Sequence, residues 1–258
     1  MKRFSMKRAF VFIAIVLAAC GGDVVGDSVK LGDAEARLRK DPHDSQSLDF
    51  ILRKLNDVSK ITRNSAAAIL RVLAAADPNV RSAIAPKSIP ALIEVAQRQD
   101  DNEQQGISAL GEFRELGAPA VPTLIKRLSD PSFPNVDYAT EALGKIGPAS
   151  IPAVPILRRQ LRNTDPNAYE FQLWVTIQLR VQSAVAIRRI VPDDRESLDY
   201  LIELLSSSDP RFRLQAIMAL QDLGKLALPA VPALESYRED ENARNAAWTI
   251  KEEAGVPR

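Results

Sequence analysis

Apolar residues along this chain recur at helical spacing, and one pattern of apolar and small residues is written several times. In its clearest copy, Ala-Leu-Gly at 142–144 ends one apolar stretch, and Ala-Val-Pro-Ile-Leu at 153–157 opens the next. Matching copies stand at 109–124 and 219–234. Proline cannot continue a helix, but it is tolerated in the first helical turn. The pattern therefore predicts pairs of helices that meet at small residues and proline.

The leucine that follows each proline pair measures the length of the repeat. It occurs at positions 92, 124, 157, 201 and 234, so the spacings are 32, 33, 44 and 33 residues. A second apolar position lies 14 residues before the last four of them, at Leu110, Leu143, Ile187 and Leu220. Two registers in step indicate a unit of two helices, which buries its apolar faces by stacking on its neighbours. We therefore expect an all-α solenoid over residues 33–258, with about five repeats and terminal caps.

Both ends of this array are expected to be helical. Apolar residues at helical spacing predict a helix at 45–55, and the last helix is expected at about 240–254, with Trp248 sealing the C-terminal end. In the first full repeat, Leu70 and Leu92 are 22 residues apart. This repeat is therefore expected to hold eight extra residues, in a loop around 77–79.

One run near the C-terminus carries the repeat pattern most completely. Its residues are Asp209-Pro210-Arg211-Phe212-Arg213, Ala216, Ala219-Leu220, Leu223-Gly224 and Ala230-Val231-Pro232-Ala233-Leu234. With these residues the chain resembles HEAT-repeat proteins of the phycobilin-lyase-like type, over residues 60–254. The resemblance implies a right-handed α-solenoid. It also implies that Arg63, Arg180 and Arg213, which hold equivalent places, make polar contacts between repeats. Fold alone does not imply a function.

One repeat is longer than the others. Between positions 165 and 187 it holds about 11 extra residues, close to three helical turns. The extra residues include three aromatic side chains, Tyr169, Phe171 and Trp174. Apolar residues at odd positions from 169 to 181 also fit a strand. We favour a helix for the C-terminal part of this segment, and 167–178 is otherwise left open.

The aromatic side chains of this long repeat allow two interpretations. They pack against the next repeat, or they form part of a site for a protein partner, because exposed aromatic anchors are common in interfaces. In the second interpretation Arg158 and Arg159 complete the partner-binding set. The second helices are expected to line a concave surface whose charge is shaped by these arginines together with Glu203 and Arg238.

The N-terminus predicts export. Four basic residues precede the apolar run 9–19, which has the length of a secretory signal and is too short to span a bilayer as a helix. The run ends in Leu-Ala-Ala-Cys at 17–20, which resembles a bacterial lipobox. We therefore expect a signal peptide at 1–19, lipidation at Cys20 and a flexible tether over 20–32. A plain secretory signal and a buried N-terminal helix are the alternatives.

The resemblance to bacterial lipoproteins also bears on location. It places the chain in the cell envelope, anchored to the membrane through the lipid on Cys20. In a Gram-negative cell, Gly21 does not match the inner-membrane retention signal, which favours the periplasmic face of the outer membrane.

Composition narrows the class of partner. The chain is 46% hydrophobic but only 5% aromatic, which suits close packing of aliphatic helices. Without the four basic residues of the expected signal peptide, 30 basic residues stand against 33 acidic ones. A net charge near −3 with no basic face gives no reason to expect nucleic acid.

The residues that enzymes need are scarce. His43 is the only histidine and Cys20 the only cysteine, so His-based metal sites and Ser-His or Cys-His pairs are excluded. The acidic pairs at 100–101 and 193–194 are interpreted as helix caps. We expect no metal, no cofactor and no catalysis. The hypothesis is a lipid-anchored envelope scaffold that binds a protein partner. The alternatives are a lyase-like or chaperone-like accessory role and a purely structural protein.

Overall fold

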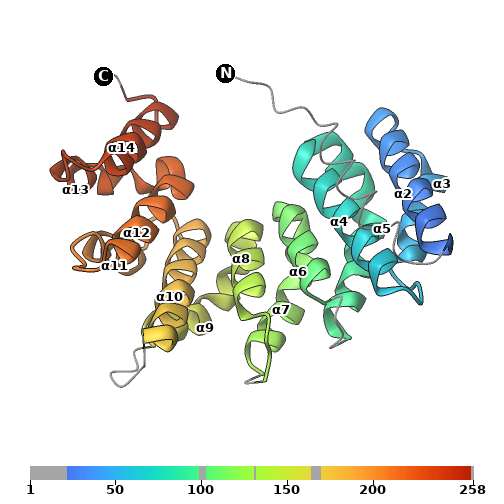
Figure 1. Cartoon of the computed structure of the whole chain (residues 1–258), viewed down its shortest axis with the longest axis horizontal. Helices are drawn as coiled ribbons and strands as arrows, with labels where there is room; N and C mark the ends of the chain where they lie inside the picture. The colour runs from blue at the N-terminus through green and yellow to red at the C-terminus, as the bar shows by residue number, and fades with distance from the viewer. Residues whose placement is uncertain (1–21, 99–102, 131, 164–169, 257–258) are drawn as a thin grey trace. The chain divides into compact units, whose positions relative to one another are not determined.

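The structure is a computed structural model that describes residues 22–98, 103–130, 132–163 and 170–256 (Figure 1). Throughout these ranges every regular element is helical, so the predicted all-α fold is confirmed. The chain divides into two compact units, residues 1–113 and 114–258, which are described in turn.

The first unit contains five described helices. They are α2 (Gly22–Lys40), α3 (Ser45–Lys54), α4 (Lys60–Ala76), α5 (Pro78–Gln97) and α6 (Glu103–Glu112). Polar side chains begin three of them: Asp44 accepts a hydrogen bond from the backbone of Ser47, Ser59 from Thr62 and Asp77 from Asn79. Such N-caps satisfy backbone N–H groups that have no partner within the helix. The helix predicted at 45–55 is confirmed as α3.

The helix α2 corrects the prediction of an irregular tether. The structure is already helical over 22–32, and α2 packs on α3 and α4. The buried residues of α2 follow helical spacing: Leu31, Ala34 and Leu38. Lys54 of α3 also pairs with Asp27 at 2.6 Å. Tertiary packing therefore stabilises a helix in a glycine-containing segment of low intrinsic propensity.

The first full repeat corrects a second prediction. The sequence suggests a loop of extra residues around 77–79, but only Asp77 separates α4 from α5. The additional residues instead lengthen α5, which runs for 20 residues and includes Pro86 and Pro90. Both prolines are exposed, and neither ends the helix.

The second unit repeats a first helix, a short 3₁₀ helix and a second helix. Its elements are η1 (Arg114–Ala120), α7 (Val121–Leu128), α8 (Val136–Ile146), η2 (Gly147–Ala153), α9 (Val154–Leu161), α10 (Glu170–Ile190), α11 (Arg195–Leu204), α12 (Pro210–Leu223), η3 (Gly224–Ala230), α13 (Val231–Ser236) and α14 (Glu241–Glu253). The predicted junction at small residues and proline is confirmed at η1, η2 and η3, each of which contains proline. Gly147 and Gly224 follow first helices at positive φ, where a side chain is strained.

The long fourth repeat is helical where it is described. The helix α10 starts at Glu170, so residues 170–178 of the undecided segment are in a helix rather than a strand. It packs on α8, α9, α11 and α12. Residues 164–169 lie outside the described part of the chain.

The repeat positions found in the sequence are the core of both units. The five leucines that measure the repeat are fully buried: Leu92, Leu124, Leu157, Leu201 and Leu234. The four positions of the second register are also fully buried: Leu110, Leu143, Ile187 and Leu220. Burial of a side chain of this size stabilises by about 1.5–3 kcal/mol. The register in the sequence is therefore a register of buried residues.

The predicted arginine contacts are also present. Arg63 donates to the carbonyl oxygens of Asp57 and Val58, and Arg213 donates to those of Ser207 and Ser208. Arg180 donates in the same way to Leu161, at 2.8 Å. Each arginine thus holds the start of a first helix to the end of the helix before it.

The final helix differs from its prediction in one side chain. The predicted element at 240–254 is α14, with Asp240 as its N-cap. Its buried side consists of small and aliphatic residues: Ala243, Ala246, Ala247 and Ile250. Trp248 does not seal the core, because 49% of its surface is exposed.

Within the described part of the chain, one stretch is long and apolar enough to cross a membrane, at 210–236. It consists of α12, η3 and α13, and Gly224 interrupts it at a φ of 54°. Half of its apolar window is buried inside the fold. Its hydrophobicity is therefore that of a repeat core.

Candidate binding groove

A groove of about 680 Å³ runs over the first helices α8, α10 and α12 of the second unit. Its floor is apolar, with Val181, Val185 and Ala186 from α10 and Ala219 from α12. Its volume lies within the range of ligand and peptide sites in proteins. The groove therefore lies on the side of the first helices, whereas the sequence directed attention to the second helices.

The wall between α8 and α10 is unusually close. A methyl group placed on Gly144 would lie 2.8 Å from Cα of Ala186. Only glycine permits this approach, because carbon atoms normally stay about 3.5–4.0 Å apart. The glycine of the repeated Ala-Leu-Gly motif thus brings α8 against α10 and shapes one side of the groove.

Trp174 lies at the groove and also packs on the next repeat. Its ring stacks on Phe212 of α12, with centroids 6.0 Å apart, and the guanidinium of Arg211 lies 5.9 Å from its centroid. Both interpretations of this aromatic residue therefore meet in one side chain. Tyr169 and the side chain of Phe171 lie outside the described part of the chain.

The lip of the groove on α12 is apolar and exposed. Met218 is 61% exposed and Leu214 is 42% exposed, and they lie four residues apart on one face. These two residues were missed in the sequence. The signal was present, since they are apolar positions of α12 outside the buried register of Ala216 and Leu220.

Two glutamine side chains add polar atoms to the apolar groove. Gln182 of α10 and Gln215 of α12 both line it. Their side-chain oxygens are buried and have no hydrogen-bond partner among the described residues. A buried acceptor without a partner costs about 1–3 kcal/mol. A bound group that donates hydrogen bonds would recover this cost.

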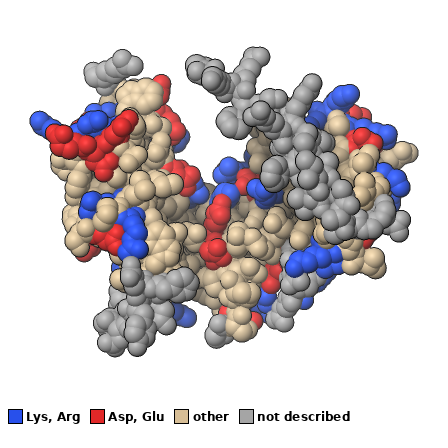
Figure 2. All heavy atoms as spheres, viewed as in Figure 1, with Lys and Arg blue, Asp and Glu red and all other residues tan. Residues whose placement is uncertain are grey.

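The charges around the groove are balanced by ion pairs. Lys145 pairs with Glu141, and Arg189 of α10 pairs with Asp222 of α12, each at 2.6 Å. On the face shown in Figure 2, positive and negative side chains are interspersed. The groove itself therefore offers apolar surface and amides rather than a field of one sign.

The predicted residues Arg158 and Arg159 lie elsewhere, on α9. Arg158 binds Asp194 at 2.6 Å and Glu196 at 2.7 Å, and so joins α9 to the start of α11. Arg159 is exposed. The structure thus does not bring these two arginines to the groove with Trp174, and Arg158 holds neighbouring repeats together.

The carboxylates of this cluster are held in their charged form. Burial alone would raise the pKa of Asp194, but hydrogen bonds from Ser197 and the charge of Arg158 outweigh it and lower that pKa. Hydrogen bonds from Arg162 lower the pKa of Glu196, and Arg158 adds to the effect. Asp194 is also the N-cap of α11, so this acidic residue is the predicted helix cap. The acidic pair at 100–101 lies outside the described residues.

The described residues contain no group of three or more His, Cys, Asp or Glu side chains that could hold a metal ion. His43 lies exposed in the turn between α2 and α3, where its backbone N–H donates to Asp41.

The fold and the groove define a class of protein, the helical-repeat proteins of the α-solenoid type. Within it, residues 177–251, from α10 to α14, match the family described as HEAT repeats. A comparison with curated protein sequences finds no match. Proteins of this class typically present extended surfaces to protein partners.

Solved structures support the same fold. The complex of CpcE and CpcF of phycocyanin lyase from Nostoc sp. PCC7120 is 16% identical, covers 93% of this chain and 92% of its own, and has a TM-score of 0.52. A HEAT-like repeats protein from the archaeon Thermococcus onnurineus NA1 is 16% identical, covers 87% and 93%, and has a TM-score of 0.50. An engineered protein is 19% identical, covers 81% and 96%, and has a TM-score of 0.51. At these identities the likeness is one of fold.

Proposed function

We propose that this protein is a non-catalytic scaffold of the bacterial envelope, anchored by a lipid on Cys20, that binds a protein partner in the groove between α8, α10 and α12. The observation that carries the proposal is the groove itself. It combines an exposed apolar lip at Leu214 and Met218 with an aromatic anchor at Trp174.

The chemistry of the groove favours an amphipathic segment of a partner protein. Its apolar side chains would lie on Met218, Leu214 and the floor of α10, as in other helix-in-groove complexes. Donors on its polar edge would meet the buried oxygens of Gln182 and Gln215. The ion pairs beside the groove leave no net charge for a polyanion to neutralise.

The anchor is supported by the sequence, since Cys20 follows an apolar run of secretory length and lies outside the described residues. An anchored protein is concentrated at the membrane with its partners, which raises the effective concentration for weak binding. Modest affinity in the groove is then sufficient for a scaffold.

Site-specific photo-crosslinking in cells tests the groove. A photoreactive amino acid replaces Met218, which is 61% exposed, and the matched control replaces Ile151, which is 58% exposed in η2 and does not line the groove. We expect a discrete crosslinked protein at 218 and none at 151. Adding Leu214→Asp to the probe variant should remove that product, because a charge on the apolar lip must be desolvated on binding.

Two results would overturn the groove proposal. One is the absence of a crosslink at 218 in cells that accumulate the folded protein. The other is the same set of products at both positions. Either result would favour an accessory role in an enzyme complex, or a structural role without a specific ligand.

Metabolic labelling tests the anchor independently. Cells grown with a palmitate analogue should label the wild-type chain, and Cys20→Ser should abolish the label without affecting the repeats. An unlabelled wild-type chain would refute the lipoprotein proposal and leave the groove proposal standing.

A further inference from the structure

The outer face of α14 carries an exposed tryptophan. Trp248 lies near the middle of this 13-residue helix, on the side opposite the buried Ala243, Ala246 and Ile250. The terminal repeat of a solenoid is normally capped by a polar outer face. A large aromatic side chain at this position is therefore a departure that calls for a partner.

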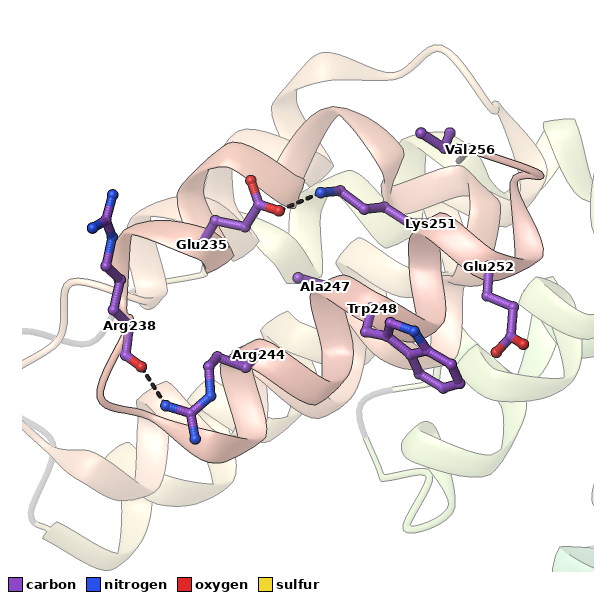
Figure 3. Close-up of a pocket in the computed structure, with 8 residues that line it drawn as sticks. All are labelled: Glu235, Arg238, Arg244, Ala247, Trp248, Lys251, Glu252 and Val256. Carbon is purple, nitrogen blue, oxygen red and sulfur yellow. Dashed lines mark hydrogen bonds and ion pairs between the residues drawn. The ribbon is translucent and has the colours of Figure 1, made fainter. Parts of the chain in front are cut away.

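A hollow of about 610 Å³ lies beside Trp248. Figure 3 shows its lining, which includes Ala247 of α14 and Val256. Two interactions fix its walls: an ion pair joins Lys251 to Glu235, and the Arg244 guanidinium donates to the Arg238 carbonyl oxygen (Figure 3). The hollow is apolar at its base and large enough to accept an indole ring.

The charges on this face are arranged about Trp248. Arg244 lies four residues before it and Glu252 four residues after it, and both are exposed (Figure 3). Four residues correspond to about 6 Å along a helix. If two copies of α14 pack antiparallel about a twofold axis at Trp248, each Arg244 comes to the level of Glu252 on the other copy. The face is therefore complementary to itself.

We propose that two copies of this chain associate through α14, antiparallel and about a twofold axis at Trp248. Trp248 of each copy enters the hollow of the other, and two pairs form between Arg244 and Glu252. This is the isologous contact that a twofold axis requires, in which one surface patch meets the same patch. Tryptophan at the centre and charges at the edge are the usual arrangement of an interface hot spot.

The contact is small, because α14 is about 20 Å long. It belongs with the weak interfaces that bury less than about 1,200 Å² in total, so dimers form at high local concentration. The proposal does not depend on the groove or its partner, which lie on α8, α10 and α12.

Co-purification of two differently tagged full-length copies tests the pairing. Both copies are co-expressed and extracted in a mild detergent, one tag is captured, and the other tag is quantified. We expect Trp248→Ala in both copies to reduce recovery at least fivefold. Arg244→Glu in both copies, or Glu252→Arg in both copies, should do the same, because like charges then face each other.

Mixing the two charge reversals is decisive. A copy with Arg244→Glu and a copy with Glu252→Arg present opposite charges at both contacts, so recovery should return to the wild-type level. Arg159→Glu in both copies is the matched control, since this exposed arginine lies on α9, and it should leave recovery unchanged. Micelle sharing affects all variants equally and cannot produce this pattern.

Circular dichroism and thermal melting establish that each variant is folded. Trp248→Ala and Glu252→Arg leave the bond from Arg244 to Arg238 intact, so they remain valid if Arg244→Glu impairs folding. Recovery at the wild-type level for these two variants would overturn the proposal. Folded single reversals whose mixture is not restored would also overturn it, and would point to another contact surface between copies.

Discussion

The close approach of α8 and α10 at Gly144 leads to a prediction with a sign that is not obvious. Replacing a helical glycine by alanine normally stabilises a helix by about 1 kcal/mol, because glycine loses more backbone freedom on folding. At Gly144 the added methyl group would lie 2.8 Å from Cα and 3.0 Å from Cβ of Ala186. The first of these atoms belongs to the backbone and cannot rotate away.

The magnitude follows from these distances. Normal carbon contacts of about 3.5–4.0 Å require the two helices to separate locally by about 0.7–1 Å. Overpacking of this kind costs about 1–3 kcal/mol. The gain of about 1 kcal/mol in helix propensity offsets only part of it, so Gly144→Ala should lose about 1 kcal/mol of unfolding free energy. Gly144→Val should lose about 3 kcal/mol, because it adds two more methyl groups at the same contact.

Tryptophan fluorescence during urea unfolding measures this effect. The two tryptophans of the chain, Trp174 and Trp248, both lie in the second unit, so their transition reports on that unit. Gly26→Ala in α2 is the matched control, because a methyl group there meets no atom within 4 Å. It should gain about 0.5–1 kcal/mol, visible by circular dichroism but not in the fluorescence transition.

A fluorescence midpoint for Gly144→Ala equal to or above that of the wild type would refute the reasoning. It would mean that α8 and α10 separate at no cost, and that the glycine of the repeated motif does not determine their distance.

Two further predictions concern the contacts between repeats. Arg213→Ala should lower the unfolding free energy by about 1–3 kcal/mol, because the carbonyl oxygens of Ser207 and Ser208 lose their donor. Arg213→Lys should recover only part of this, and equal stability of all three proteins in urea would contradict the prediction. The pKa of Asp194 is lowered in the folded state, so its charge contributes stability above its unfolded pKa, about 3.8, and this contribution is lost as the pH falls through the lower folded value. The stability difference between wild type and Asp194→Asn should therefore shrink as the pH drops below about 4, and a difference that does not vary between pH 7 and 3 would contradict it.

Much of the fold follows from the spacing of apolar residues. The leucines that measure the repeat and the apolar position 14 residues before them proved to be fully buried, as at Leu157 and Leu143. This succeeds because each repeat is a local unit whose core faces are set by helical periodicity. The arginines at equivalent places, such as Arg213, were also predicted correctly, since their partners lie only a few residues away.

The errors have one common cause. The sequence predicted a tether where α2 begins and a loop where α5 continues, because glycine and proline weigh heavily in local propensity. Packing of Leu31 and Leu38 against neighbouring helices outweighs the low propensity of α2. Arg158 was assigned to a partner, although it binds Asp194 across two repeats. Nothing in the spacing of these two residues indicates that they meet.

The sequence by itself determined the repeat, its helical class, its buried register and the absence of the usual catalytic pairs, because these depend on periodicity and residue type. The tertiary structure decided which apolar residues remain exposed. Met218 and Trp248 look like core residues in the sequence, but each lies on the outer face of its helix. That outcome depends on how far each helix is rotated toward its neighbours, and this rotation is set by packing across the repeats, as at the contact between Gly144 and Ala186.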